Sequence, residues 1–136
     1  MTSAIRFHAR LASISNAPSE FRLLNGFPPM SFGLGSGDIE DHNTHTFMKW
    51  LDQDPRGKSP FCKHILSIIE SIKEVEEELI ENDQKAVIVI LTDGDSATDG
   101  ELTEVMKPLE DLPVWLVVRL CTDDQKVVRF WNELDK

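Results

Sequence analysis

Cysteine is scarce in this sequence, which has two cysteines among 136 residues. Cys62 and Cys121 are far apart and form no CxxC pair, so the chain lacks the disulfide framework of small secreted domains. We therefore expect a reduced, intracellular protein, and we place it in the cytoplasm.

Long apolar runs and an excess of positive charge are also lacking. No stretch approaches the roughly 20 apolar residues of a membrane helix. Arg6, His8 and Arg10 interrupt the apolar pattern at the N-terminus, which is unlike a signal peptide. Lys and Arg number 14 against 24 Asp and Glu, a formal charge of −10. Nucleic acid and anionic membranes repel such a chain, so we expect neither as a partner.

What is present is the composition of an ordinary globular protein, with 40% hydrophobic and 28% charged residues. Residues 1–136 are enough for one domain with its own core. We expect the three tryptophans to belong to that core: Trp50, Trp115 and Trp131.

The first half of the chain gives weak patterns. Residues 4–15 fit both a half-buried strand and one face of a helix, so both interpretations stay open. Residues 20–25 predict a short strand, and the glycines and prolines of 26–37 predict a loop. A short helix is expected at 44–52, with Phe47, Trp50 and Leu51 facing inward.

A long amphipathic helix is predicted from Pro60 to about Ile80. Pro60 suits the first helical position, which makes Ser59 the N-cap residue. Apolar residues recur at spacings of four and three along one face, and they are Phe61, Ile65, Ile68, Ile72, Val75 and Leu79.

Two apolar strands are predicted in the second half, at 86–91 and 114–118. Both are apolar throughout, as is typical of parallel strands that are covered on both faces. Helices are expected after each strand, so the order is β-α-β-α and the sheet is parallel, in an α/β fold.

Capping-box spacings mark where those two helices begin. Thr98 and Glu101 open the first helix, and Thr122 and Gln125 open the second. The residues expected to face inward are Leu102, Val105, Met106 and Leu109 in the first helix, and Val127, Phe130, Trp131 and Leu134 in the second.

An acidic and hydroxyl-rich cluster follows the first of these strands, within VIVILTDGDSATDG (87–100). Ligands bind at the carboxyl ends of parallel strands, and carboxylate and hydroxyl oxygens suit Mg²⁺. Asp95, Ser96 and Thr98 are more simply explained as loop and helix-cap residues. For Asp93 the structural and the metal-binding interpretations both stay open.

One enzymatic alternative starts from the same cluster. An apolar strand followed by TDGDS resembles the DxD start of haloacid-dehalogenase-like, Mg²⁺-dependent phosphohydrolases, with Asp93 as nucleophile and Asp95 as acid. Asp123 and Asp124 would then stand for the later acidic pair. Those enzymes have more sheet after the motif than this chain has left.

Five segments in order resemble a von Willebrand factor A-type (vWA) domain of the intracellular eukaryotic group: FRLLNG, GKSPFCKHI, VIVILTDGDS, PVWLVVRLCTDD and VVRFWNELD. The resemblance covers nearly the whole chain. It implies a doubly wound, Rossmann-like α/β fold with a mostly parallel sheet. It also implies a non-enzymatic protein-interaction module whose protein partner the sequence does not identify.

Many vWA domains hold Mg²⁺ in a metal-ion-dependent adhesion site. The resemblance places Ser59 at the position of that site's Thr and Asp93 at the position of its last Asp. The DxSxS motif, which supplies an Asp and two Ser, occurs nowhere in this chain, and Lys58 puts a cation beside Ser59. We therefore expect an incomplete site that binds Mg²⁺ weakly at most, and no other cofactor.

The strand that carries DxSxS in the family is missing as well. It would lie between the strands equivalent to 20–25 and 86–91, so the chain is expected to be an N-terminally truncated vWA domain or a non-functional gene fragment. A helix at 4–15 fits the family better than a strand. We then expect either an open gap or a poor direct pairing of 20–25 with 86–91. The apolar strand 86–91 would have an edge that needs a partner or a second copy to cover it.

Overall fold

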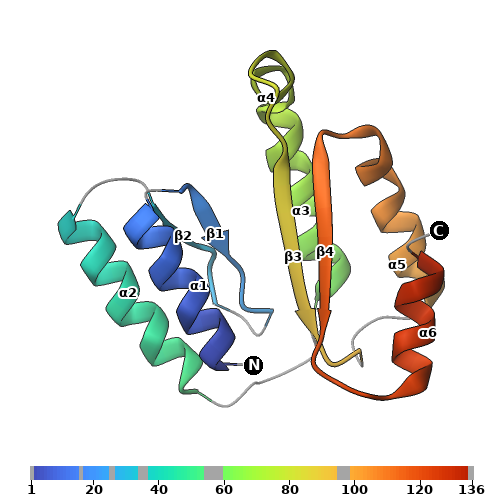
Figure 1. Cartoon of the computed structure of the whole chain (residues 1–136), viewed down its shortest axis with the longest axis horizontal. Coiled ribbons are helices and arrows are strands. Elements are labelled where there is room, and N and C mark those ends of the chain that lie inside the picture. The colour runs from blue at the N-terminus through green and yellow to red at the C-terminus, as the bar shows by residue number, and fades with distance from the viewer. Residues whose placement is uncertain are drawn as a thin grey trace. The chain divides into compact units, whose positions relative to one another are not determined.

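A computed structural model describes residues 2–15, 17–24, 27–33, 37–53, 60–94 and 99–134 (Figure 1). The side chains of 2, 37–41, 99–100 and 134 are outside this description. The chain divides into two compact units, Met1–Ser59 and Pro60–Lys136.

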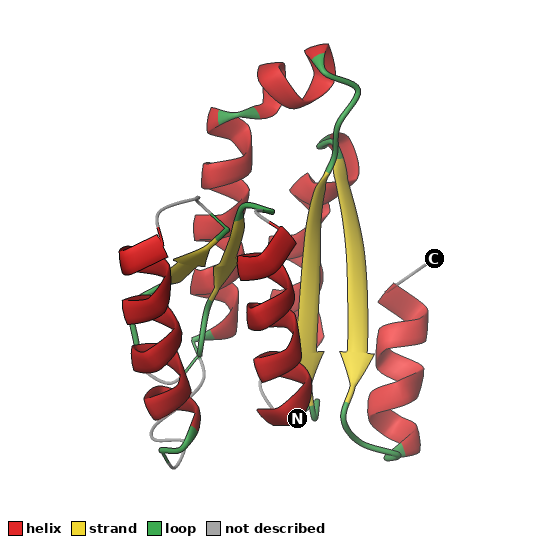
Figure 2. Cartoon of the chain, turned by 60° about the vertical axis from the view of Figure 1, so that its left-hand side comes forward, coloured by secondary structure: helices red, strands yellow, loops and turns green. Residues whose placement is uncertain are grey.

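The first unit pairs two helices with a small hairpin (Figure 2). Its strands pair antiparallel, with Glu20 opposite Ser31. In chain order the elements are α1 (Thr2–Ser15), β1 (Ser19–Phe21), β2 (Met30–Phe32) and α2 (Gly37–Leu51).

Aromatic side chains form the centre of the first unit. Phe32 and Phe47 are both fully buried, and their rings meet edge to face at 5.4 Å between centroids. Phe21 packs against both rings, at 5.3 Å from Phe32 and 5.4 Å from Phe47. Ala9 and Ala12 of α1 complete this core, because small side chains let the helix approach the rings closely.

The second unit contains a parallel strand pair and its helices. In chain order the elements are α3 (Phe61–Glu74), α4 (Glu76–Glu81), β3 (Ala86–Thr92), α5 (Asp99–Met106), the 3₁₀ helix η1 (Lys107–Asp111), β4 (Val114–Leu120) and α6 (Gln125–Leu134). The parallel β-α-β order predicted from the sequence is confirmed. The structure is therefore an α/β fold with a parallel pair and a separate antiparallel hairpin.

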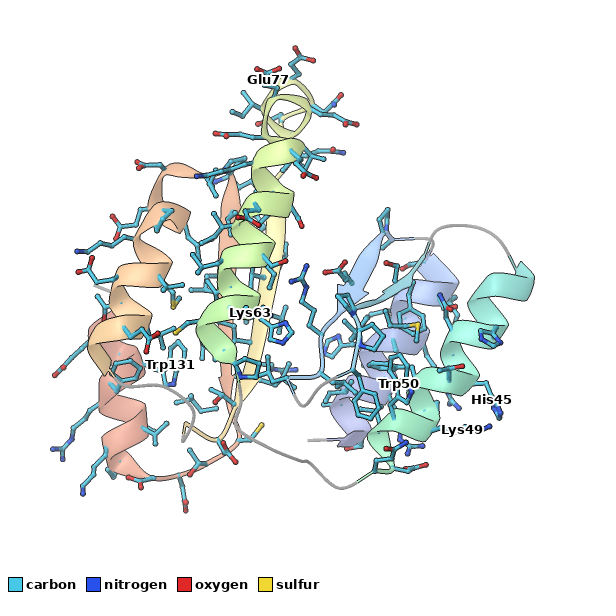
Figure 3. All side chains as sticks on the ribbon, turned by 180° about the vertical axis from the view of Figure 1, so that it is seen from behind. His45, Lys49, Trp50, Lys63, Glu77 and Trp131 are labelled. Carbon is cyan, nitrogen blue, oxygen red and sulfur yellow. The ribbon has the colours of Figure 1, made fainter. Side chains whose placement is uncertain are left out.

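Strands β3 and β4 pair over their whole length, from Ala86 opposite Val114 to Thr92 opposite Leu120. They lie side by side and run the same way. Helix α3 lies behind them in Figure 1 and in front of them in the reverse view of Figure 3, and α5 lies behind them in the turned view of Figure 2. Ile88 and Ile90 point to this helix-covered face and are 7% and 6% exposed. Their burial gives the second unit its apolar core.

The other face of the strand pair is exposed, which corrects a prediction. Val87 lies opposite Trp115 and Val89 opposite Val117, and the four side chains are 56%, 61%, 45% and 43% exposed, respectively. We expected continuous apolar strands to be covered on both faces and Trp115 to be a core residue. Both expectations are wrong within the second unit, where α3 and α5 pack against the opposite face.

The predicted helix at 60–80 is interrupted. Helix α3 ends at Glu74, and Val75 leaves the helical region with φ −115° and ψ 8° before α4 begins. Val75 is 43% exposed, although its spacing predicted an inward position. At the other end, α3 begins at Phe61, so Pro60 occupies the N-cap position that we expected for Ser59. Pro60 has no side-chain oxygen and makes no capping hydrogen bond.

The first unit also differs from its prediction in detail. Residues 4–15 are helical, as the family resemblance favoured. The strand predicted at 20–25 is the shorter β1, and the predicted loop at 26–37 contains β2. Helix α2 begins at Gly37, well before the predicted start at 44. Among the described helices, none has both the length and the apolar character that a membrane span requires.

Candidate functional site

The sequence TDG at the carboxyl end of β3 forms a turn in which two of the three residues have structural roles. Thr92 is 7% exposed, and its Oγ1 accepts a hydrogen bond of 3.0 Å from the N–H of Gly94. The Thr92 carbonyl accepts a second bond, of 2.8 Å, from the N–H of Cys121 after β4. The first bond stabilises the turn itself, and the second links the end of β3 to the residue that follows β4.

Position 94 requires a glycine for two reasons, its backbone conformation and its contact with the side chain of Val127. Its φ is +93°, a region that residues with a Cβ rarely adopt. A Cβ at this position would lie 2.2 Å from Cγ1 of Val127 on α6. Glycine thus lets α6 pack against the end of β3.

Asp93 stands between these two residues and is exposed. The turn consequently presents a carboxylate to solvent at the carboxyl edge of the parallel pair, where α/β proteins bind ligands.

The described part of the chain does not include the side chains of the other predicted metal-site residues. Ser59 lies outside the described residues, and so do Asp95, Ser96 and Thr98. Asp99 lies in α5, but its side chain is not described. Across the described residues, no group of three or more His, Cys, Asp and Glu side chains forms a metal site.

In the loop after β4, Asp124 caps the helix that follows. Oδ1 of Asp124 accepts a hydrogen bond of 2.8 Å from the N–H of Lys126, and its carbonyl accepts the first helical bond, from Val128. Asp124 is therefore the N-cap of α6. Thr122, which we expected to cap this helix, accepts a bond from the Asp124 N–H and fixes the turn before it. The capping-box prediction is wrong by two residues.

Both cysteines are free. Cys62 lies half-buried on α3, and burial raises the pKa of its thiol, with a further increase from the negative charge of Glu101 on α5. A raised pKa keeps the thiol protonated and unreactive. Cys121 is exposed after β4.

Trp131 confirms one of the three predicted core positions. It lies on α6, as Figure 3 shows, and is 8% exposed. Its indole Nε1 is buried and has no hydrogen-bond partner within the described residues. Trp50, also labelled in Figure 3, is half-buried and stacks on Phe27 at 4.9 Å.

Comparison of the chain with protein-family models, curated proteins and solved structures finds no match in any of the three.

Proposed function

We propose that this chain is a non-enzymatic protein-interaction module of the vWA type, with an incomplete metal-ion-dependent adhesion site. The observation that supports the proposal is the TDG turn. It follows a strand of a parallel pair. Asp93 is exposed there, between Thr92, which accepts a hydrogen bond within the turn, and Gly94, which packs against Val127. Asp93 is the position that, in the resemblance, corresponds to the adhesion site's last Asp.

The donor set limits what this site can do. The described residues contain no group of three or more His, Cys, Asp and Glu side chains that could hold a metal, so Mg²⁺ at Asp93 would keep most of its water ligands and bind weakly. The module would therefore contact its protein partner through its own side chains. Exposed apolar residues on β3 and β4 provide a surface of the kind that proteins use for this purpose.

Isothermal titration with MgCl₂ tests the metal part of the proposal. We expect no binding tighter than about millimolar, both in the native chain and in Asp93→Asn. Asp123→Asn is the matched control, because Asp123 is an exposed aspartate after the neighbouring strand. Micromolar binding that is lost in Asp93→Asn and kept in Asp123→Asn would show a complete adhesion site and contradict the proposal.

Hydrolysis of p-nitrophenyl phosphate with Mg²⁺ tests the enzymatic alternative. A phosphohydrolase that uses Asp93 as nucleophile loses all turnover in Asp93→Asn, because an amide cannot form the aspartyl-phosphate. We expect no turnover in the native chain. Turnover in the native chain that Asp93→Asn abolishes would replace the interaction module by the phosphohydrolase.

A further inference from the structure

Strand β3 has one edge that no described strand covers. Within the described residues it pairs with β4 alone. Ala86 donates its N–H to the Pro113 carbonyl at 2.9 Å, and the Thr92 carbonyl accepts from Cys121 at 2.8 Å. Successive peptide groups of a strand point to opposite sides, so the even-numbered residues bond to β4. The N–H and C=O groups of Val87, Val89 and Leu91 therefore point to the uncovered edge.

This edge lacks the features by which proteins prevent strand pairing. Residues 86–92 contain no charge, no proline and no glycine, whereas protected edges carry such residues. The strand is flanked by opposite charges, Lys85 before it and Asp93 after it, and both side chains are exposed. The Lys85 Nζ lies 5.6 Å from the ring centroid of Trp115 on the adjacent strand.

We propose that two copies of this chain pair through their β3 edges, antiparallel and symmetric about Val89. In this arrangement Val89 lies opposite Val89 of the second copy. The strands form a continuous sheet with β4 at each outer position. The interface is isologous, as in most homodimers. The proposal does not depend on a metal or on the proposed function.

The charges at the two ends select this register. With Val89 at the symmetry axis, Lys85 of each copy lies opposite Asp93 of the other, so two equivalent ion pairs form. Ile88 lies opposite Ile90 on the helix-covered face, and Val87 lies opposite Leu91 on the exposed face. Every outward N–H and C=O group of β3 also meets a partner, because residues in such pairs exchange two hydrogen bonds.

Other registers lose one or more of these matches. A shift by two residues places either Val87 opposite Asp93 or Lys85 opposite Leu91, so a charge faces an apolar side chain. A shift by one residue brings the helix-covered side chains of one copy opposite the exposed-face side chains of the other. Opposite charges in cross-strand pairs stabilise a sheet and like charges destabilise it, so self-pairing at Val89 is favoured over the alternatives.

Charge reversal tests the register, with sedimentation equilibrium as the readout. We expect the native chain to dimerise. Lys85→Glu and Asp93→Lys should each raise the dimer dissociation constant about tenfold or more, because each places like charges in both symmetric pairs. The double variant Lys85→Glu/Asp93→Lys restores opposite charges and should restore dimerisation. A monomeric native chain overturns the proposal, and so does a double variant no better than the single ones.

A matched pair of lysine substitutions separates edge pairing from association through the exposed face. Val89 and Val117 are adjacent in the β3–β4 register and almost equally exposed, at 45% and 43%. Val89→Lys places two ammonium groups together at the symmetry axis and should abolish the dimer. Val117→Lys adds the same charge one strand further away and should leave it. Equal loss of the dimer in both variants would overturn edge pairing, and circular dichroism confirms that each variant is folded.

Amide hydrogen exchange provides a readout that needs no substitution. The N–H groups of Ile88 and Ile90 bond to β4 and should be protected at every concentration. Those of Val87, Val89 and Leu91 should gain protection as the concentration rises through the dimer dissociation constant. Protection that is independent of concentration at these three residues would contradict the proposal, and added EDTA should change none of these results.

Discussion

Gly94 at the end of β3 lies directly against the side chain of Val127 on α6, so that a Cβ on Gly94 would meet Cγ1 of Val127 at 2.2 Å. The same glycine has φ +93°. Gly94→Ala should therefore destabilise the chain by about 2–4 kcal/mol, from backbone strain and overpacking together. Urea denaturation followed by circular dichroism measures this change.

A second substitution separates the two causes. Val127→Ala removes both γ carbons that a Cβ on residue 94 would meet and leaves the Cβ of residue 127 at 2.9 Å, so the double variant Gly94→Ala/Val127→Ala should recover most of the steric part of the loss. The strain from the positive φ should persist. If the double variant is no more stable than expected from simple addition of the single losses, the contact with Val127 does not explain why glycine is needed.

The N-cap of α6 gives a second prediction. Asp124→Ala removes the oxygen that accepts the Lys126 N–H and should cost about 1 kcal/mol. Asp123→Ala removes the neighbouring exposed carboxylate and should change stability by less than about 0.5 kcal/mol. Equal losses in the two variants, in the same urea assay, would argue against the cap.

The thiol of Cys62 predicts a pH dependence of stability. Its pKa is raised in the folded chain by burial and by Glu101, so the folded state keeps its proton at pH values where the unfolded state has lost it. The free energy of unfolding should then fall as the pH rises through the ordinary thiol range, up to the folded pKa. Cys62→Ser should remove this alkaline loss, as measured by urea denaturation across the alkaline range.

Thiol reactivity tests the same assignment at the level of single residues. Cys121 is exposed and should react with a disulfide reagent before Cys62. In a Cys121→Ser background, Glu101→Gln should speed the reaction of Cys62, because it removes a charge that raises the pKa of that thiol. Glu133→Gln, which changes an exposed glutamate of α6, should leave the rate unchanged.

The aromatic centre of the first unit gives a fourth prediction. Phe47 is fully buried between Phe21 and Phe32, so Phe47→Ala should cost about 3–5 kcal/mol. Phe7 of α1 is 63% exposed, and Phe7→Ala should cost far less. Thermal unfolding monitored by circular dichroism compares the two, and similar losses would contradict the assignment of the core.

Local patterns in the sequence predict the second unit better than the first. Strand β3 and helix α5 follow from apolar runs and spacing, since Leu102 and Met106 of α5 are buried as expected, and so is Leu109 in η1. The hairpin strand β2 was missed because its three residues lie in a segment rich in glycine and proline. Its burial depends on Phe21 and Phe47, which are distant in the sequence.

The sequence of a strand or helix does not show which of its faces another element of the fold covers. The apolar run of β3 is equally consistent with one covered face or two, and the structure exposes Val87 and Val89. Likewise, the apolar stripe continues through Val75, but the backbone leaves the helix there. The motif TDG lies at the carboxyl end of β3, as its position after the apolar run predicted. The contact of its glycine with Val127 could not be predicted, because Val127 is far along the chain.

The uniform register of β3 with β4 has a kinetic consequence. Each pair joins residues 28 positions apart, as Ala86 and Val114 do. The entropy of closing that loop is lost once, with the first pair, and the later pairs require no further loop closure. The ladder should therefore form by zippering after one slow encounter, which the helical crossover of α5 and η1 brings about. Substitutions in that crossover should slow folding more than they speed unfolding.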